Sequence, residues 1–442
     1  MMSLLPTGQS PVQIHDFNYM KAINVFKMLA VAGMIPGIMA AQSVADEPMV
    51  TVIVGDPAAS EDVEVEFMEN APAKKRDNGL PRFAIVGKDR KFYLGIGAQF
   101  QGEGVVDFGD EMPSAVDFVP SSIVPSTPGN GASLRFSALT SSIYINAVAL
   151  PGTKDRVGLF FKGKIHNGDA YGFSVSHFYV TYRGFMAGYT SSFFADGAAM
   201  PYTIDNQGPN GSADVTLFTA GYTHDFTSHL SGAIGIDAPS IDMTTGRETS
   251  TVSQRSPAIP LYLQYGWGGD SHVRLSGIVR PLQYRDLVAE KNRTPVGWGV
   301  QLSGVAEVSP LLTLYYDATY GRGIANYLQD DTGLGLDMTP SLETPGESRL
   351  TESLGLTGGL TLNLSPKVAV NAVYSHLVNR TGDGASLDGD RYRYGDYVAA
   401  NVIYTLNKIV AMGIEYDYGH RKAFDSSLLH TSRIQAQLAV TF

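Results

Sequence analysis

The sequence ends in a segment whose side chains alternate between apolar and polar, and this alternation recurs along most of the chain. From Ile434 to the terminal Phe442 an apolar side chain occupies every second position, and polar or small residues lie between them. A period of two is that of a β-strand with one apolar and one solvated face. Such a strand suits a soluble β-sandwich or a membrane barrel.

The composition narrows this choice. The chain of 442 residues contains no cysteine, 48 glycines, 23 tyrosines and 20 phenylalanines, and only 17% of its residues are charged. Glycines and aromatic residues in short alternating segments favour barrels over helical folds. The absence of cysteine excludes disulfides and thiolate chemistry and suits an exported protein. The net charge of −11 argues against a nucleic-acid partner.

From residue 91 onward we count about sixteen alternating segments, many of them as long as the 9–11 residues that a tilted strand needs to cross a bilayer. The predicted strands are 92–106, 131–150, 156–166, 172–182, 185–193, 215–226, 230–237, 258–267, 272–280, 296–308, 311–320, 350–364, 368–378, 392–406, 409–418 and 428–442. Turns of two to five residues alternate with connections that include the long loops 107–130, 194–214, 239–257, 321–349 and 379–391.

This asymmetry of the connections is typical of membrane barrels, whereas a soluble sandwich has no reason to keep it. No apolar run after residue 45 is long enough for a transmembrane helix. We therefore predict an all-β fold in which residues 91–442 form a transmembrane antiparallel β-barrel of about 16 strands, with long external loops and short periplasmic turns. The terminal Phe442 then lies at the periplasmic interface, and a terminal Phe on such a strand resembles the signal that these barrels present to their assembly machinery.

Residues 20–45 have the organisation of a signal peptide. Basic residues precede the apolar run 28–39, and small residues follow it. We predict cleavage after Ala45 or after Ala41, and we expect residues 1–19 to be an untranslated or dispensable leader. Residues 46–90 are then a periplasmic N-terminal segment. A flexible tail is its simplest interpretation, although 50–54 and 83–86 have the composition of short strands.

The alternation also assigns the charged residues of the strands to one face. A lysine or arginine on the lipid face costs roughly 2–4 kcal/mol, so the charged face must line a water-filled interior. The predicted lining residues are Arg135, Lys162, Lys164, Arg274, Arg280, Arg393 and Arg433, with Glu307, Asp317, Glu415 and Asp417. Because basic residues outnumber acidic ones, we expect a mild preference for anions. Alternatively, these charges pair across the interior and brace the wall.

The stretch 177–211 is the most specific part of the sequence. It combines an aromatic-rich strand, a tight turn, Ala-Gly-x-Thr at 187–190, an acidic residue and Gly-Pro-Asn-Gly at 208–211. Together with Gly-Trp-Gly at 297–299 and the segment 320–327, it resembles the DcaP-like trimeric porins over about residues 91–442. After the Gly-Pro-Asn-Gly segment the family usually has arginines that lead into the next strand. This chain has Val-Thr-Leu-Phe-Thr at 215–219 instead.

The resemblance implies a sixteen-stranded barrel in the outer membrane of a Gram-negative bacterium, a homotrimer, and the passage of small, often anionic solutes. It also implies that loop 194–214 folds inward and narrows the pore. The loop residues themselves support this, since several are polar groups able to pair with the wall: Asp196, Tyr202, Asp205, Asn206 and Gln207. Glycines in the loop permit tight bends. An ordinary external loop is the alternative.

We therefore expect an outer-membrane porin for passive diffusion of small hydrophilic, anionic solutes. The alternative is a substrate-specific channel, or a surface receptor or adhesin whose external loops bind a ligand. The expected partners are the solutes, outer-membrane lipid, the barrel assembly machinery and further copies of the chain, but no nucleic acid. The sequence shows no nucleophile elbow, phosphate-binding loop or paired histidines, so we expect no catalytic residue, metal or cofactor.

Overall fold

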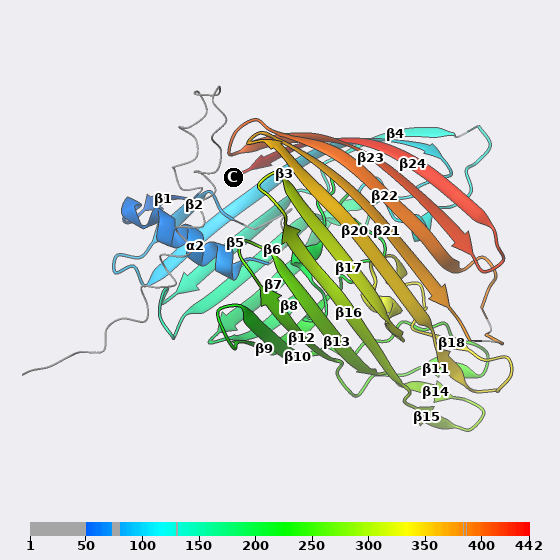
Figure 1. The fold of residues 1–442 in the computed structure, drawn as a ribbon. Helices are drawn as coiled ribbons and strands as arrows, with labels where there is room; N and C mark the ends of the chain where they lie inside the picture. Colours follow the sequence, from blue (N-terminus) through cyan, green and yellow to red (C-terminus); the bar gives the residue numbers. More distant parts are fainter. Residues whose placement is uncertain (1–49, 73–79, 130, 383, 386) are drawn as a thin grey trace, which may run out of the picture. The chain divides into compact units, whose positions relative to one another are not determined.

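The computed structural model describes residues 50–72, 80–129, 131–382, 384–385 and 387–442, so the predicted signal peptide lies outside the described residues. Its main element is an antiparallel sheet that closes into a barrel where the last strand pairs with β3 (Figure 1). The barrel strands are β3 (Phe92–Gly109), β4 (Ala132–Ser137), β5 (Ser142–Ala149), β6 (Val157–Asn167), β7 (Ala170–Tyr182), β8 (Phe185–Ser191), β9 (Thr216–Asp225), β10 (Leu230–Asp237), β12 (Ile259–Gly266), β13 (His272–Pro281), β16 (Val296–Glu307), β17 (Leu312–Arg322), β20 (Glu352–Ser365), β21 (Val368–Arg380), β22 (Tyr392–Thr405), β23 (Val410–Ala423) and β24 (Leu428–Thr441).

The predicted number of strands is confirmed. β4 and β5 both pair with β3 and are two halves of one barrel strand, which gives a 16-stranded barrel. The long connections also contain short elements that the alternation did not predict. These are β11 (Thr249–Thr251), β14 (Tyr284–Asp286), β15 (Lys291–Arg293), β18 (Met338–Pro340), β19 (Ser348–Leu350) and the short helices η2 (Pro120–Ser122), η3 (Gly197–Ala199), η4 (Ala325–Tyr327) and η5 (Gln329–Asp331).

The two faces of the barrel wall differ in chemistry as the alternation predicts. On β24 the apolar Ile434 and Leu438 are exposed, whereas Gln435 and Gln437 between them are buried. Since the sheet is closed, its backbone groups pair within the protein, as a bilayer requires. The apolar face therefore points outward, to lipid, and the polar face points into the barrel. None of the described helices is long and apolar enough to cross a membrane.

The N-terminal segment forms a small βαβ unit beside the short-turn end of the barrel (Figure 1). β1 (Thr51–Val54) runs parallel to β2 (Phe83–Val86), and β2 pairs antiparallel with the beginning of β3. Between them lie η1 (Pro57–Ala59) and the helix α2 (Ser60–Asn70). The two short strands are confirmed, but the prediction of a flexible tail is wrong for these residues.

Specific contacts hold α2 against the inner face of the barrel wall. The Asn70 side-chain amide donates to Asn146 Oδ1 at 2.8 Å, and Tyr179 donates to the Asn70 carbonyl at 2.7 Å. Glu66 forms an ion pair of 2.5 Å with Arg156. Gly158 permits this approach, because a Cβ there would lie 1.9 Å from Asn70 Oδ1. Apolar side chains of β1, α2, β2 and β3 form a shared core, which the sequence pattern did not reveal.

Candidate functional site

The interior of the barrel contains most of the charged residues predicted to line it. Lys162, Arg280 and Arg433 lie on the inner face and are buried. Arg393 differs from them, because it is exposed near the long-loop end of β22 beside an irregularity in the strand pairing. The role of these residues as channel lining stays a prediction. The structure does give ion-pair and hydrogen-bond partners for several of them.

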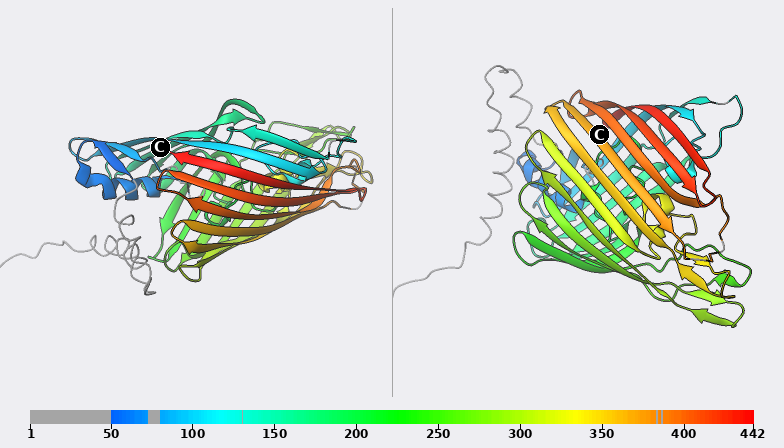
Figure 2. Two further views of the ribbon diagram at one scale, coloured as in Figure 1. Left: turned by 90° about the horizontal axis from the view of Figure 1, so that it is seen from above. Right: turned by 45° about the vertical axis from the view of Figure 1, so that its right-hand side comes forward.

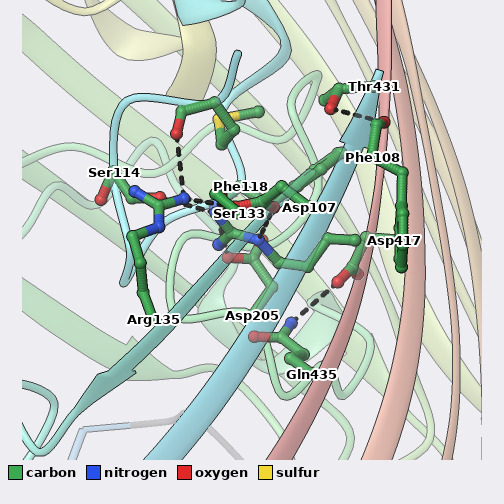
Figure 3. A network of polar contacts seen from close by, with 12 residues as sticks. Asp107, Phe108, Ser114, Phe118, Ser133, Arg135, Asp205, Asp417, Thr431 and Gln435 are labelled. Atoms are coloured by element: carbon green, nitrogen blue, oxygen red, sulfur yellow. Dashed lines mark hydrogen bonds and ion pairs between the residues drawn. The ribbon is translucent and has the colours of Figure 1, made fainter. Parts of the chain in front are cut away.

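Two of the predicted arginines share one carboxylate that the prediction omitted (Figure 3). Arg433 Nε on β24 lies 2.7 Å from Asp107 Oδ1 on β3, and Arg135 on β4 pairs with the same carboxylate. Arg433 also donates to the Ser114 carbonyl at 2.6 Å. This cluster ties three adjacent strand segments and the loop after β3 together. Its arginines therefore brace the wall.

Two more arginines join the wall to loops. Arg280 lies 2.8 Å from Asp337 Oδ1, in the loop after β17, and both side chains are buried. Arg274 donates to the Ala195 carbonyl at 3.0 Å and stacks on Tyr262 at 3.9 Å. The contacts of these arginines thus agree with the alternative interpretation, in which the interior charges pair and stabilise the barrel wall.

The loop between β8 and β9, residues 192–215, is attached at one end to β13 and β16. The Asp196 carboxylate lies 2.9 Å from His272 Nε2 and accepts a hydrogen bond of 2.7 Å from Ser303. Burial alone would raise the pKa of Asp196, but the charge of Arg274 and the hydrogen bonds from His272 and Ser303 outweigh it and lower this pKa. Asp196 is therefore an ionised anchor of the loop.

The same loop also reaches β21 and β23, which lie farther around the barrel. Glu415 on β23 accepts hydrogen bonds from the backbone amides of Ile204 at 2.8 Å and Asp205 at 2.6 Å. The Gly211 amide donates to Ser375 on β21 at 2.9 Å. Gly208 has a φ of +82°, and a Cβ on Gly211 would lie 2.5 Å from the His376 carbonyl oxygen. The segment therefore contacts inward side chains on strands that are several positions apart in the sheet.

Three further residues predicted for the constriction take part in these contacts. The Tyr202 carbonyl accepts a hydrogen bond of 3.2 Å from Asn401. Asn206 Oδ1 accepts one of 3.1 Å from Lys164 on β6, and the Asn206 amide donates to Asp117 at 2.6 Å. Gln207 Nε2 lies 3.3 Å from Asp330 Oδ1. The structure thus brings the predicted residues together, while a restriction of solute flow by them stays a prediction.

Two loops expected to lie outside also enter the interior. The Phe118 amide, after β3, donates to Asp205 at 2.8 Å, and the Ser121 amide donates to Asp330 at 3.0 Å. The loop after β17 contributes Asp330 and packs Tyr327 into an apolar cluster with Phe194. The sequence analysis expected an inward fold only for loop 194–214, and the structure adds segments of the loops after β3 and β17. The apolar residues of 324–328 were the sequence signal that could have shown this.

Two buried carboxyl groups make these loop contacts dependent on pH. Burial raises the pKa of Asp330 to about 7. Burial, and then the charges of Asp117 and Glu415, raise the pKa of Asp205 to about 7. Because the folded pKa of each lies above the ordinary 3.8, the folded state binds more protons in this range. The stability of the loop packing therefore falls from about pH 4 to pH 7 and is level above that.

We expect the loops to be held more firmly at pH 5 than at pH 8. Amide hydrogen exchange of residues 204–208, corrected for its intrinsic pH dependence, should show protection about tenfold or more higher at pH 5. In Asp330→Asn this difference should shrink, since one of the two titrating groups is gone. Equal protection at both pH values would contradict the prediction.

No protein-family model and no curated protein matches the sequence. Among solved structures, the outer membrane channel DcaP of Acinetobacter baumannii matches with a TM-score of 0.69 and 19% sequence identity, over 81% of this chain and 99% of that chain. The chain has the fold of the DcaP channel. The resemblance to DcaP-like porins is thus confirmed for the fold.

Two further neighbours are more distant. A loop L8 deletion mutant of OmpT, an outer membrane protein of Vibrio cholerae, has a TM-score of 0.49 and 11% identity, over 80% of this chain and 100% of that chain. An anion-selective porin from Comamonas acidovorans has a TM-score of 0.49 and 9% identity, over 79% of this chain and 100% of that chain.

Proposed function

We propose that the protein is an outer-membrane porin through which small hydrophilic solutes diffuse passively. The observation that carries this proposal is the loop 192–215, which connects separate parts of a polar inner wall inside a closed barrel with an apolar outer face. The DcaP fold supports it. The decisive experiment is reconstitution of the mature protein in planar bilayers and in liposomes. Ion conductance together with entry of small sugars and organic acids is expected, and barrels that neither conduct nor admit solutes would refute the proposal.

The interior favours a selective channel over a wide general one. Three loops meet inside the barrel and are joined by hydrogen bonds, among them those from Phe118 and Gln207 to carboxylates of neighbouring loops. Such bonds reduce both the open cross-section and the freedom of the loops to move. A liposome-swelling series over solute size and charge separates the two possibilities. Rates that depend on solute identity at equal size indicate a specific channel.

We further propose that anions are preferred and that β6 supplies this preference. Four of the predicted arginines lie on the inner face, where they contact carboxylates or loop carbonyls. Lys162 and Lys164 also lie on the inner face, and Lys164 contacts the amide oxygen of Asn206. Their positive charge would then act on passing ions through the field at the constriction.

Lys162→Glu/Lys164→Glu is expected to lower the anion-to-cation permeability ratio by about threefold or more, because it replaces two positive charges by two negative ones. Reversal potentials in a salt gradient measure this ratio. The matched control is Lys154→Glu/Lys367→Glu, which makes the same charge change in two periplasmic turns. An unchanged ratio in the β6 variant would remove these lysines from the selectivity of the channel.

The resemblance to DcaP-like porins also implies three copies per assembly, which we propose for this chain. The mass of the detergent-solubilised protein, measured with its bound detergent, tests this directly. Amino-terminal sequencing of the exported protein tests the proposed signal peptide. The expected first residue is Asp46, or Gln42 for the earlier cleavage site.

A further inference from the structure

A row of polar side chains lies on the outer face of four adjacent strands, which Figure 2 shows side by side in orange and red. His376 on β21, Asp396 on β22, His420 on β23 and His430 on β24 are consecutive cross-strand partners. On each strand a direct neighbour of these residues is buried on the inner face: Ser375, Tyr397, Gly419 and Thr431. The row therefore points away from the channel, on a surface that the porin function does not use.

A second outer row continues this surface on β17, β20 and β21. Arg322 pairs across strands with Glu352, and Glu352 pairs with Arg380. The two guanidinium groups share the carboxylate at 3.2 Å and 3.6 Å. The side chains of Arg322 and Arg380 are 55% and 69% exposed, and their two positive charges share a single negative charge.

The height of these rows on the barrel follows from the strand register. On β24 the outward residues between Phe442 and Ser432 are Val440, Leu438, Ala436 and Ile434. About 10 residues at about 3.3 Å each, tilted by about 40°, rise by roughly 25 Å, the height of the apolar band of an outer-membrane barrel. His430 is the next outward residue. The rows thus begin where the apolar band ends, on the side of the long loops.

The chemistry of the row agrees with a position at the lipid headgroups. Tyrosines on its membrane side, such as Tyr374 and Tyr418, occupy the place of an interfacial aromatic girdle. Tyr374 donates to Asp396 at 2.8 Å, and the same carboxylate lies 2.7 Å from His376 and 3.2 Å from His420. A carboxylate bracketed by basic groups would be costly against hydrocarbon, but it is tolerated among headgroups.

The charge balance of the surface indicates the kind of headgroup. Lys422 faces outward in the register row between the two described here, as the partner of Tyr394. The surface carries three basic side chains, Arg322, Arg380 and Lys422, against the two carboxylates of Glu352 and Asp396. An anionic headgroup with phosphate oxygens would complement this excess and accept bidentate hydrogen bonds from the arginines.

We propose that the outward faces of β17 and β20–β24, at their long-loop ends, bind phosphate-bearing glycolipid headgroups of the external leaflet. Arg322, Arg380 and Lys422 contact the phosphates, and the row from His376 to His430 contacts the headgroup below them. This inference depends on the membrane location in the proposed function, but not on conduction. Lipid binding and ion conductance therefore fail or succeed separately.

The test uses the full-length mature protein in nanodiscs that contain a phosphorylated glycolipid and phosphatidylethanolamine. Native mass spectrometry after detergent release counts the glycolipid molecules retained by each barrel. Arg322→Gln/Arg380→Gln/Lys422→Gln is expected to retain about tenfold less glycolipid than the unchanged protein, because each cation near a lipid surface contributes to binding. Dephosphorylated glycolipid should be retained equally poorly by both proteins.

The matched control is Lys154→Gln/Arg183→Gln/Lys367→Gln, which removes three charges from the periplasmic turns and should retain the glycolipid normally. Heat-modifiable electrophoretic mobility shows that each variant is a folded barrel, and its conductance is expected to be unchanged. Equal retention by the two triple variants would overturn the proposal. Dissociation of the assembly by the first triple variant alone would also overturn it, because the surface would then contact another copy of the chain.

Discussion

Arg280→Met is expected to lower the free energy of unfolding by about 3–5 kcal/mol. Arg280 and Asp337 are both almost completely buried, and they lie 2.8 Å apart. Removal of the guanidinium leaves the carboxylate of Asp337 without its counter-charge in a site that water does not reach. It also removes the contact between Arg280 and the Tyr327 ring. Urea unfolding of the refolded barrel in micelles or lipid vesicles measures the change.

Two further variants separate the buried charge from the loss of packing. Arg280→Met/Asp337→Asn removes both charges, keeps an acceptor for the Asn326 amide, and should recover part of the lost stability. Arg322→Gln breaks an exposed ion pair with Glu352 and should change the stability by less than about 1 kcal/mol. A loss in Arg280→Met no larger than that in Arg322→Gln would show that the loop after β17 is not held by this pair.

Glu415→Ala is expected to release loop 192–215 from the wall of β23. The carboxylate accepts hydrogen bonds of 2.8 Å and 2.6 Å from the amides of Ile204 and Asp205. It also accepts bonds of 2.6 Å from Asn401 and 2.8 Å from Gln435. Each buried donor left without an acceptor costs about 1–3 kcal/mol. Protection of the loop amides against hydrogen exchange should therefore fall by about a hundredfold, and single-channel conductance should become larger or noisier.

Glu307→Ala is the matched control for this variant. Glu307 is an exposed glutamate at the periplasmic end of β16, on the same inner face. Its removal should leave the protection of the loop unchanged. If Glu415→Ala behaves like Glu307→Ala in both measurements, the loop is held by other contacts, and its proposed role at the constriction would need another basis.

The barrel itself could be predicted well because its signal is local. Each strand carries its own alternation, and the charged residues of β6 and β24 fall on the face opposite the apolar ones. Since lipid tolerates only one of these faces, the pattern settles which side is outside. The loop segment with Asp196 and Asp205 was also recognisable, from its polar composition and from the family resemblance.

The pairing of the interior charges could not be predicted, because it joins residues far apart in the chain. Asp107 forms ion pairs with both Arg135 and Arg433, although it lies 326 positions before Arg433 in the sequence. The count of basic and acidic lining residues in the sequence analysis therefore omitted carboxylates such as Asp107. No alternation in their own segment marked them as lining residues. The same reason hid the docking of α2, whose Asn70 contacts only become possible once β5 and β6 are side by side.

The sequence by itself determined the membrane barrel, its strand number and the direction of its two faces, because period-two alternation and loop length are properties of consecutive residues. Only the tertiary structure decided which loops enter the interior, which arginines are compensated and which outward side chains form a continuous row. Those outcomes depend on the cross-strand register and on barrel closure, which bring residues from different strands to the same height.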